Sequence, residues 1–250
     1  MLPELTTKTT IFPCPSNDPM MKRYLIAGLT VDMDVSGRTY TQAAPYEIPI
    51  DGTPADITLE CDTKKLMEQN PGKFPSESDL EYFATGILFA RNVLNFNGYY
   101  LHSSSVILDG KAYLFTATSG TGKSTHTEKW CRLFGAHYLN DDKPVLRLRD
   151  GVWMAYGTPW SGKHDLSSNE GVPVGGIACL RRGSENTIAP MPAAKAIPFL
   201  MSQTVNRLYQ EQVENKLALL DKLLREVPVW ELYCRNDDDA AYVAHSAMTC

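Results

Sequence analysis

The alternation of hydrophobic and polar residues changes character near residue 75. Before that point, short β-prone runs are separated by turn residues, which predicts strands over residues 23–34, 46–49 and 55–61. After it, apolar residues recur at helical spacing, with Ser78 as the expected N-cap of a long helix. We therefore expect a small N-terminal β-rich region over residues 1–75 and a larger domain over residues 76–250.

The next part of the chain predicts a hairpin that leads into a glycine-rich octet. Alternating residues from Tyr99 to Leu108 indicate a strand, and Asp109-Gly110 is typical of a two-residue turn. The return strand enters residues 117–124, which read Ala-Thr-Ser-Gly-Thr-Gly-Lys-Ser, and a helix is expected to follow as far as Phe134. This order of strand, glycine-rich loop and helix is the context that a phosphate-binding loop requires.

The octet fits the pattern GxxxxGK[ST] except that Ala117 replaces the first glycine. Glycines allow successive backbone N–H groups to point toward phosphate oxygens, and the start of the helix favours an anion. Lys123 would reach the β- and γ-phosphates, and the Ser124 hydroxyl can bind Mg²⁺. The residues expected to hold a nucleotide are Thr118, Ser119, Gly120, Thr121, Gly122, Lys123, Ser124 and Thr125.

A pair of acids, Asp141 and Asp142, follows a short predicted strand over residues 136–140. Enzymes with a phosphate-binding loop hold their metal near such a carboxylate, and a second acid can take the proton of an attacking hydroxyl. By itself the pair would be read as a solvated turn before Lys143-Pro144, and the upstream loop favours the functional interpretation.

These segments together resemble the catalytic domain of the HPr kinase/phosphorylase family, which is related to the phosphoenolpyruvate carboxykinases. The resemblance rests on Leu101-His102-Ser103, the hairpin, the octet and residues 139–142. It implies an α/β phosphotransferase domain with a mixed sheet and a P-loop that binds ATP through Lys123. It also implies Mg²⁺ at Ser124 and one acid of the pair, with the other acid as the base and His102 near it; Asp141 is the preferred base and Asp142 the preferred metal ligand. The family's arginine-containing signature is not recognisable here, so the acceptor and any phosphorylase activity are not carried over.

Lys163 is a further candidate, because it lies in a glycine-containing loop and could place positive charge over a transferring phosphoryl group. A solvated surface lysine is the equally good alternative. Arg181 and Arg182, at the end of a predicted strand, could guide an anionic substrate, although a solvated face is the simpler interpretation.

Composition narrows the class of protein. With 24 Lys and Arg against 29 Asp and Glu, the net charge is −5, which argues against a nucleic-acid partner. No apolar run has the length of a membrane helix, and the N-terminus lacks the features of a signal peptide. The six cysteines have no zinc-ligand spacing and are expected to be reduced thiols. We expect a cytoplasmic protein with no membrane partner; a homo-oligomer is compatible with the sequence.

The preferred function is an ATP- and Mg²⁺-dependent kinase that transfers the γ-phosphate to a hydroxyl of a protein serine or a small molecule. One alternative is a nucleotide-binding sensor or assembly module without catalysis. Another is a carboxykinase-like enzyme acting on a small acid. A GTPase is disfavoured because no Asn-Lys-x-Asp element follows the loop.

Overall fold

The computed structural model describes residues 21–205 and 210–249. The chain divides into two compact units, residues 1–89 and 90–250. The division falls inside helix α3 (Glu77–Asn92), whereas the sequence pattern placed a boundary before this helix. Each unit has its own sheet, so each can be described by itself.

The smaller unit contains a four-stranded sheet in the order β3-β1-β2-β4. The strands are β1 (Lys22–Ile26), β2 (Leu29–Met33), β3 (Glu47–Ile48) and β4 (Ile57–Leu59), and the short helices are α1 (Gly37–Ala43), η1 (Ala44–Tyr46) and α2 (Thr63–Gln69). The prediction of one strand over residues 23–34 was wrong. Ala27 and Gly28 adopt φ values of 53° and 71°, and this two-residue turn folds the run into the β1–β2 hairpin.

The N-cap of helix α3 is Ser76, and not Ser78. The Ser76 hydroxyl accepts the Asp79 N–H at 3.1 Å, as an N-cap side chain does, and donates to the Asp79 carboxylate at 2.6 Å. The Ser78 hydroxyl instead accepts the backbone N–H of Arg38 at 3.0 Å. The predicted helix is therefore confirmed, and its cap lies two residues earlier.

The larger unit is built on a mixed nine-stranded sheet with the path β5-β9-β10-β11-β7-β6-β8, and β13 pairs with both β11 and β12. Its strands are β5 (Gly98–Tyr100), β6 (Ser103–Leu108), β7 (Lys111–Thr116), β8 (His137–Asn140), β9 (Val145–Arg149), β10 (Val152–Tyr156), β11 (Gly171–Arg182), β12 (Thr187–Pro190) and β13 (Val229–Cys234). A mixed α/β architecture with a small N-terminal sheet was expected, and the structure has it.

The hairpin between β6 and β7 is confirmed by its turn, where Asp109 and Gly110 have φ values of 50° and 74°. The predicted strand over residues 99–108 is broken at Leu101 and His102. As a result, β5 pairs with β9 while β6 pairs with β7 and β8. The break leaves His102 directly before the first residue of β6.

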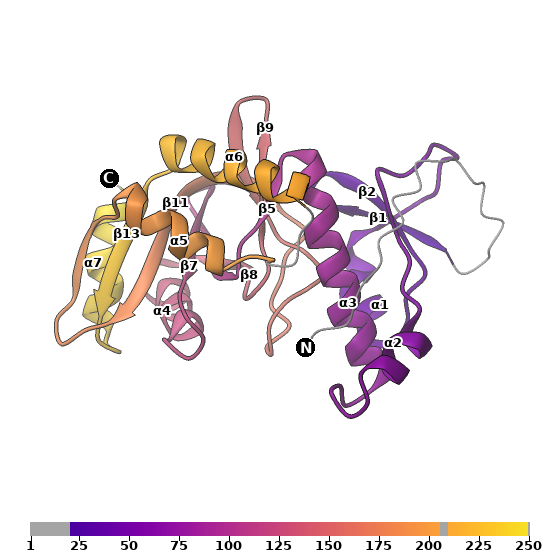
Figure 1. Cartoon of the computed structure of the whole chain (residues 1–250). Coiled ribbons are helices and arrows are strands. Elements are labelled where there is room, and N and C mark those ends of the chain that lie inside the picture. The colour runs from indigo at the N-terminus through magenta and orange to yellow at the C-terminus, as the bar shows by residue number, and fades with distance from the viewer. Residues whose placement is uncertain (1–20, 206–209, 250) are drawn as a thin grey trace. The chain divides into compact units, whose positions relative to one another are not determined.

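Helices cover both faces of this sheet (Figure 1). On one face, α5 (Ala193–Ser202) and α6 (Gln210–Glu226) pack against strand residues such as Ile177 and Cys179. On the other, α4 (Lys123–Phe134) and α7 (Asp238–Met248) pack against Ala178 and Leu180. A short helix, η2 (Val93–Phe96), precedes β5. Consecutive residues of β11 thus enter opposite cores, as the twofold periodicity of a strand requires.

The strand directions bring several segments to one edge of the sheet. β7 is parallel to β11, and β6 is antiparallel to both β7 and β8. Consequently β7, β8 and β11 all end at the same edge, where β6 begins. The segments at this edge are His102, the glycine-rich loop, the two aspartates and Arg182.

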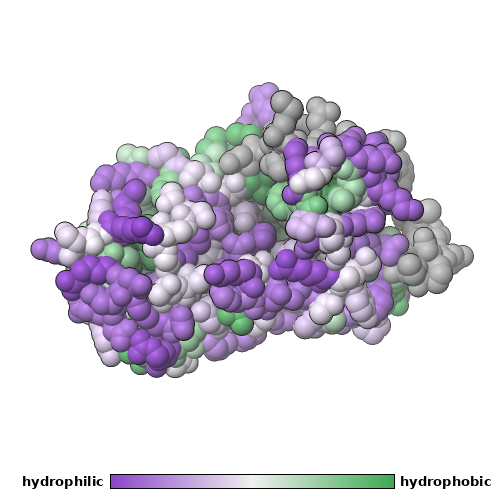
Figure 2. Space-filling view, turned by 90° about the horizontal axis from the view of Figure 1, so that it is seen from below, coloured by the Kyte–Doolittle hydropathy of each residue, from purple (hydrophilic) through white to green (hydrophobic). Residues whose placement is uncertain are grey.

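The surface of the larger unit is mostly hydrophilic on the side that Figure 2 shows, with hydrophobic residues in small separate areas. Within residues 21–205 and 210–249, no helix combines the length and apolar character needed to span a bilayer.

Candidate functional site

The glycine-rich loop connects the end of β7 to the start of α4. Gly120 and Gly122 have φ values of 78° and 113°, in the region that side chains disfavour, which explains the glycines. Ala117 is buried and is not among the residues with positive φ, so its position does not demand the glycine of the usual pattern. The departure from the motif is therefore compatible with the loop's backbone.

The start of α4 presents unpaired backbone donors. Its N-cap is Gly122, which supplies no side-chain cap. Within the described part of the chain, the N–H groups of Gly122, Lys123, Ser124 and Thr125 donate to no protein acceptor. A Cβ at Gly120 or Gly122 would meet no atom within 4 Å, so the space over the loop is open. Unpaired amides at a helix N-terminus in open space suit an anion.

Contacts from inside and outside the loop fix its shape. The Thr118 and Thr121 hydroxyls lie 2.9 Å apart, and the Thr121 N–H donates to the Thr118 carbonyl at 3.3 Å. Arg182, at the end of the neighbouring strand β11, donates through Nη2 to the Gly120 carbonyl at 2.6 Å. The sequence suggested for Arg182 only the guidance of an anionic substrate or a solvated face; its contact with the loop depends on the pairing of β7 with β11.

Lys123 folds back over the loop, where its Nζ donates to the Ala117 carbonyl at 3.2 Å. Burial lowers the pKa of the Lys123 ammonium, and the negative charge of Asp142 partly opposes that shift. A partly desolvated cation beside unpaired amides is the arrangement expected of a phosphate-binding lysine.

Two nitrogen-bearing side chains, His102 and Lys143, hold the Asp142 carboxylate. His102 Nε2 lies 2.9 Å from one carboxylate oxygen, and Lys143 Nζ lies 2.7 Å from the other. Burial opposes ionisation, but the hydrogen bonds and charges of His102 and Lys143 outweigh it and hold the pKa of Asp142 well below its usual range. The sequence placed His102 beside the base. In the structure its ring contacts Asp142 because the Ser103 N–H, next in the chain, donates to the Asp142 carbonyl at 3.2 Å.

Asp141 lies in a different environment, although it is the adjacent residue. Asp141 is only 6% exposed, and its carboxylate accepts the Gly162 N–H. Burial raises the pKa of Asp141, and the charge of Asp142 adds to that effect, while the backbone donors of Gly162 and His164 oppose it. Gly162 fits closely, since a Cβ there would lie 3.0 Å from an Asp141 oxygen. The paired acids thus have pKa values displaced in opposite directions.

Asn140 positions this pair and was not singled out from the sequence. Asn140 is fully buried, and its Oδ1 accepts the Asp142 N–H at 2.9 Å and the Lys143 N–H at 2.5 Å. Its amide nitrogen donates to the carbonyls of Thr158 and Trp160 at 3.0 and 3.2 Å. One side chain therefore joins the turn after β8 to the loop after β10.

Lys163 lies in that second loop with an exposed side chain, and makes no hydrogen bond or ion pair with another described residue. The structure brings its neighbour Gly162 to Asp141, but not Lys163 itself.

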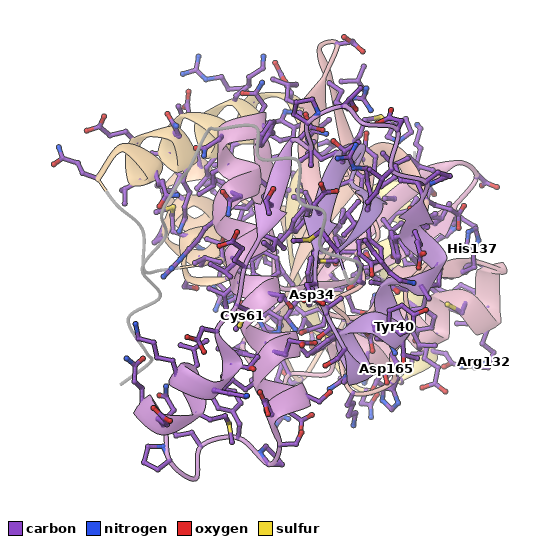
Figure 3. The ribbon with its side chains drawn as sticks, turned by 90° about the vertical axis from the view of Figure 1, so that its right-hand side faces the viewer. Asp34, Tyr40, Cys61, Arg132, His137 and Asp165 are labelled. Atoms are coloured by element: carbon purple, nitrogen blue, oxygen red, sulfur yellow. The ribbon has the colours of Figure 1, made fainter. Side chains whose placement is uncertain are left out.

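Two surface ion pairs lie away from the site. Figure 3 shows Arg132 and His137 at the rim of the molecule, where they pair with Asp238 and Glu170.

The residues beside the loop include two oxygen ligands of the kind that Mg²⁺ uses. Among the described residues there is no cluster of three or more His, Cys, Asp or Glu side chains that could hold an ion. Mg²⁺ commonly takes one or two protein ligands and completes its shell with water and phosphate oxygens. The Ser124 hydroxyl and the ionised Asp142 carboxylate are suitable ligands of that kind.

Comparison with known proteins gives a remote likeness. No protein-family model matches the sequence, and no curated protein matches it. Among solved structures, the chain is similar to the HPr(Ser) kinase/phosphatase from Coxiella burnetii, over 59% of this chain and 95% of that chain. The two share 13% sequence identity, with a TM-score of 0.34. The likeness marks a distant structural relationship only, and assigns no role to any residue.

Proposed function

We propose that this protein is an ATP- and Mg²⁺-dependent phosphotransferase that moves the γ-phosphate to a hydroxyl acceptor. The observation that carries the proposal is the convergence at one sheet edge of the glycine-rich loop, with unpaired amides and Lys123, and two acids of opposite pKa displacement. The loop supplies an anion site. Asp141, with its raised pKa, is suited to accept a proton, and the ionised Asp142 is suited to a cation.

In the proposed transfer, one bond to the γ-phosphorus forms while another breaks. The acceptor hydroxyl gives its proton to the Asp141 carboxylate while its oxygen forms a bond to the γ-phosphorus. The bond from that phosphorus to the β,γ-bridging oxygen breaks, and ADP leaves with those electrons. Lys123 and the amides of residues 122–125 stabilise negative charge on the phosphate oxygens. Asp141 then returns its proton to solvent.

Mg²⁺, held by Ser124 and Asp142, would neutralise charge on the phosphates and keep them oriented. His102 and Lys143 contribute by keeping Asp142 ionised and its carboxylate fixed in place. His102 is thus a positioning residue in this scheme, while Lys123 and Asp141 act on the substrates directly.

The proposal is tested first by nucleotide binding. Replacing Lys123 with Ala removes a charge-assisted hydrogen bond to phosphate, which is about 1.5 to 3 kcal/mol, or a roughly 10- to 100-fold weaker affinity. Titration of a fluorescent ATP analogue with Mg²⁺ measures the change. Lys111→Ala is the matched control, because this exposed lysine begins β7 at the opposite edge of the sheet. Equal affinity of all three proteins would refute the phosphate site.

Transfer itself is tested by incubating the protein with ATP labelled at the γ-phosphate, Mg²⁺ and a cell extract. The expected result is label on a protein or a small molecule, absent with Lys123→Ala. ATP binding without transferred label under these conditions would instead favour a nucleotide-binding module that has no catalytic activity.

A further inference from the structure

A groove of about 590 Å³ lies at the same edge of the sheet, on the face covered by α5. One wall is the exposed side of that helix, and the other is formed by the ends of β11 and β13. The residues that matter for its chemistry are Arg181, Lys195, Phe199, Ser202, Glu231 and Tyr233. None of them has a role in the phosphate site described above.

The groove adjoins that site through the sheet and through α5. Cys179 of β11 is paired with Thr116 of β7, so Arg181, two residues further on, is level with the first residues of the glycine-rich loop. Neighbouring strands are about 4.8 Å apart. At the end of α5, the Gln203 carbonyl accepts the His102 N–H at 2.7 Å. A molecule in the groove would therefore extend toward His102 and its partner Asp142.

The groove carries excess positive charge. Arg181 Nε lies 2.6 Å from Glu231, and Lys195 Nζ lies 3.5 Å from the same carboxylate, so two cations share one anion. The Lys195 side chain is 60% exposed. The Nη groups of Arg181 make no hydrogen bond to any residue within the described ranges. The Arg181 guanidinium also lies over the Phe199 ring, 5.4 Å from its centroid.

We propose that this groove binds an acidic peptide segment of the phosphate acceptor, and this inference rests on the proposed phosphotransferase function. The exposed face of α5 presents Lys195, Phe199 and Ser202 at helical spacing over about 10 Å, which suits an extended chain better than a compact molecule. Carboxylates of the peptide pair with Lys195 and with the Arg181 Nη groups. An uncharged adenosine would leave both cations without that pairing.

The chain's overall charge makes the inference sharply testable. At a net charge of −5, the protein as a whole repels an acidic peptide, so a preference for such a peptide must come from a local cationic surface. The probes are three fluorescein-labelled peptides with the same central serine, flanked on both sides by glutamate, glutamine or lysine. Their binding to the full chain with ADP and Mg²⁺ is followed by fluorescence anisotropy.

The expected result is at least tenfold tighter binding of the glutamate peptide than of the lysine peptide. Lys195→Glu should weaken the glutamate peptide at least tenfold and strengthen the lysine peptide, and Arg181→Gln should also weaken the glutamate peptide. Lys111→Glu makes the same change of charge at the opposite edge of the sheet and should alter neither affinity. Because Lys195 is exposed, its substitution leaves the core intact.

Two results would overturn the inference. One is equal binding of the three peptides to the unmodified protein. The other is a loss of affinity for the fluorescent ATP analogue in Lys195→Glu with unchanged peptide binding, which would assign the groove to the nucleotide. The proposed function fails separately, through intact ATP affinity in Lys123→Ala, so the two failures are distinguishable.

Discussion

Asp141 and Asp142 are neighbours in sequence, yet the structure surrounds them with different groups. Asp142 accepts from His102 and Lys143, whereas Asp141 is buried against the backbone of the loop after β10. Because the donors His102 and Lys143 favour ionisation of Asp142, and burial disfavours ionisation of Asp141, the first pKa is lowered and the second is raised. This contrast supports the proposal that Asp141 is the base and Asp142 a ligand of Mg²⁺.

Replacing Asp141 with Asn should preserve affinity for ATP and lower the rate of transfer by about 10²- to 10⁴-fold, the usual contribution of a general base. In the unmodified protein, the rate should decline as pH falls through the raised pKa of Asp141, which lies above the ordinary value of about 3.9. Pre-steady-state rates of labelled phosphate transfer across pH measure both effects. Parallel loss of ATP affinity and rate would move Asp141 to the metal-binding role.

At the scale of elements, the site depends on the junction between the end of β8 and the loop after β10. Asn140→Ala removes hydrogen bonds to two N–H groups and two carbonyls in a fully buried place. We expect a loss of about 2 to 3 kcal/mol in the free energy of unfolding, measured by urea titration. Asn236→Ala is the control, because Asn236 is exposed and accepts one bond from Lys129, so its loss should cost less than about 0.5 kcal/mol.

An Asn140→Asp variant separates the bonds that Asn140 accepts from the bonds that it donates. It keeps the acceptor for the Asp142 and Lys143 N–H groups but cannot donate to the carbonyls of Thr158 and Trp160. Its stability should still be low, because a buried carboxylate would then face two carbonyl oxygens that cannot donate to it. Wild-type stability in both variants would contradict the assigned role of Asn140.

The elements that sequence predicted well are those set by local chemistry. Asp109-Gly110 requires a tight turn, and the loop glycines with the following helix need no distant partner to be recognised. Two hairpins were missed for different reasons. Asp150-Gly151, between β9 and β10, carries the same turn signal as Asp109-Gly110 and was overlooked, whereas the Ala27-Gly28 turn is concealed inside a continuous β-prone run. Gly162 and Arg182 reach the site only through strand order, which spacing along the chain does not reveal.

At the scale of the whole molecule, a net charge of −5 is compatible with local anion sites. Several acids have their own hydrogen-bond donors or cationic partners, which keep them ionised. Asp51 in the smaller unit has its pKa lowered by the Thr53 hydroxyl, and Asp237 in the larger unit by Asn186. For Glu231, as for Asp142, burial opposes ionisation and cationic partners outweigh it, so the pKa is again lowered. Folding is therefore coupled to deprotonation of acids in both units.

This coupling predicts the direction of acid unfolding. A carboxyl whose pKa is lower in the folded than in the unfolded chain contributes stability that is present above the unfolded pKa of about 3.9 and is lost as pH falls through the folded value. The urea midpoint should hold steady down to about pH 5 and fall below about pH 4. Because Asp141 has a raised pKa, its contribution has the opposite sign and offsets part of this loss.

Asp142→Asn isolates one contribution to that profile. All four tryptophans lie in the larger unit, so their fluorescence reports the unfolding of the unit that contains Asp142. At pH 7 the variant should be less stable, because His102 and Lys143 lose an anionic partner. The difference should begin to shrink below about pH 4, because the unfolded chain then takes up a proton at Asp142 that the folded protein, with its lowered pKa, does not. A difference that stays constant between pH 7 and pH 3 would show that Asp142 stabilises the fold by its shape and not by its charge.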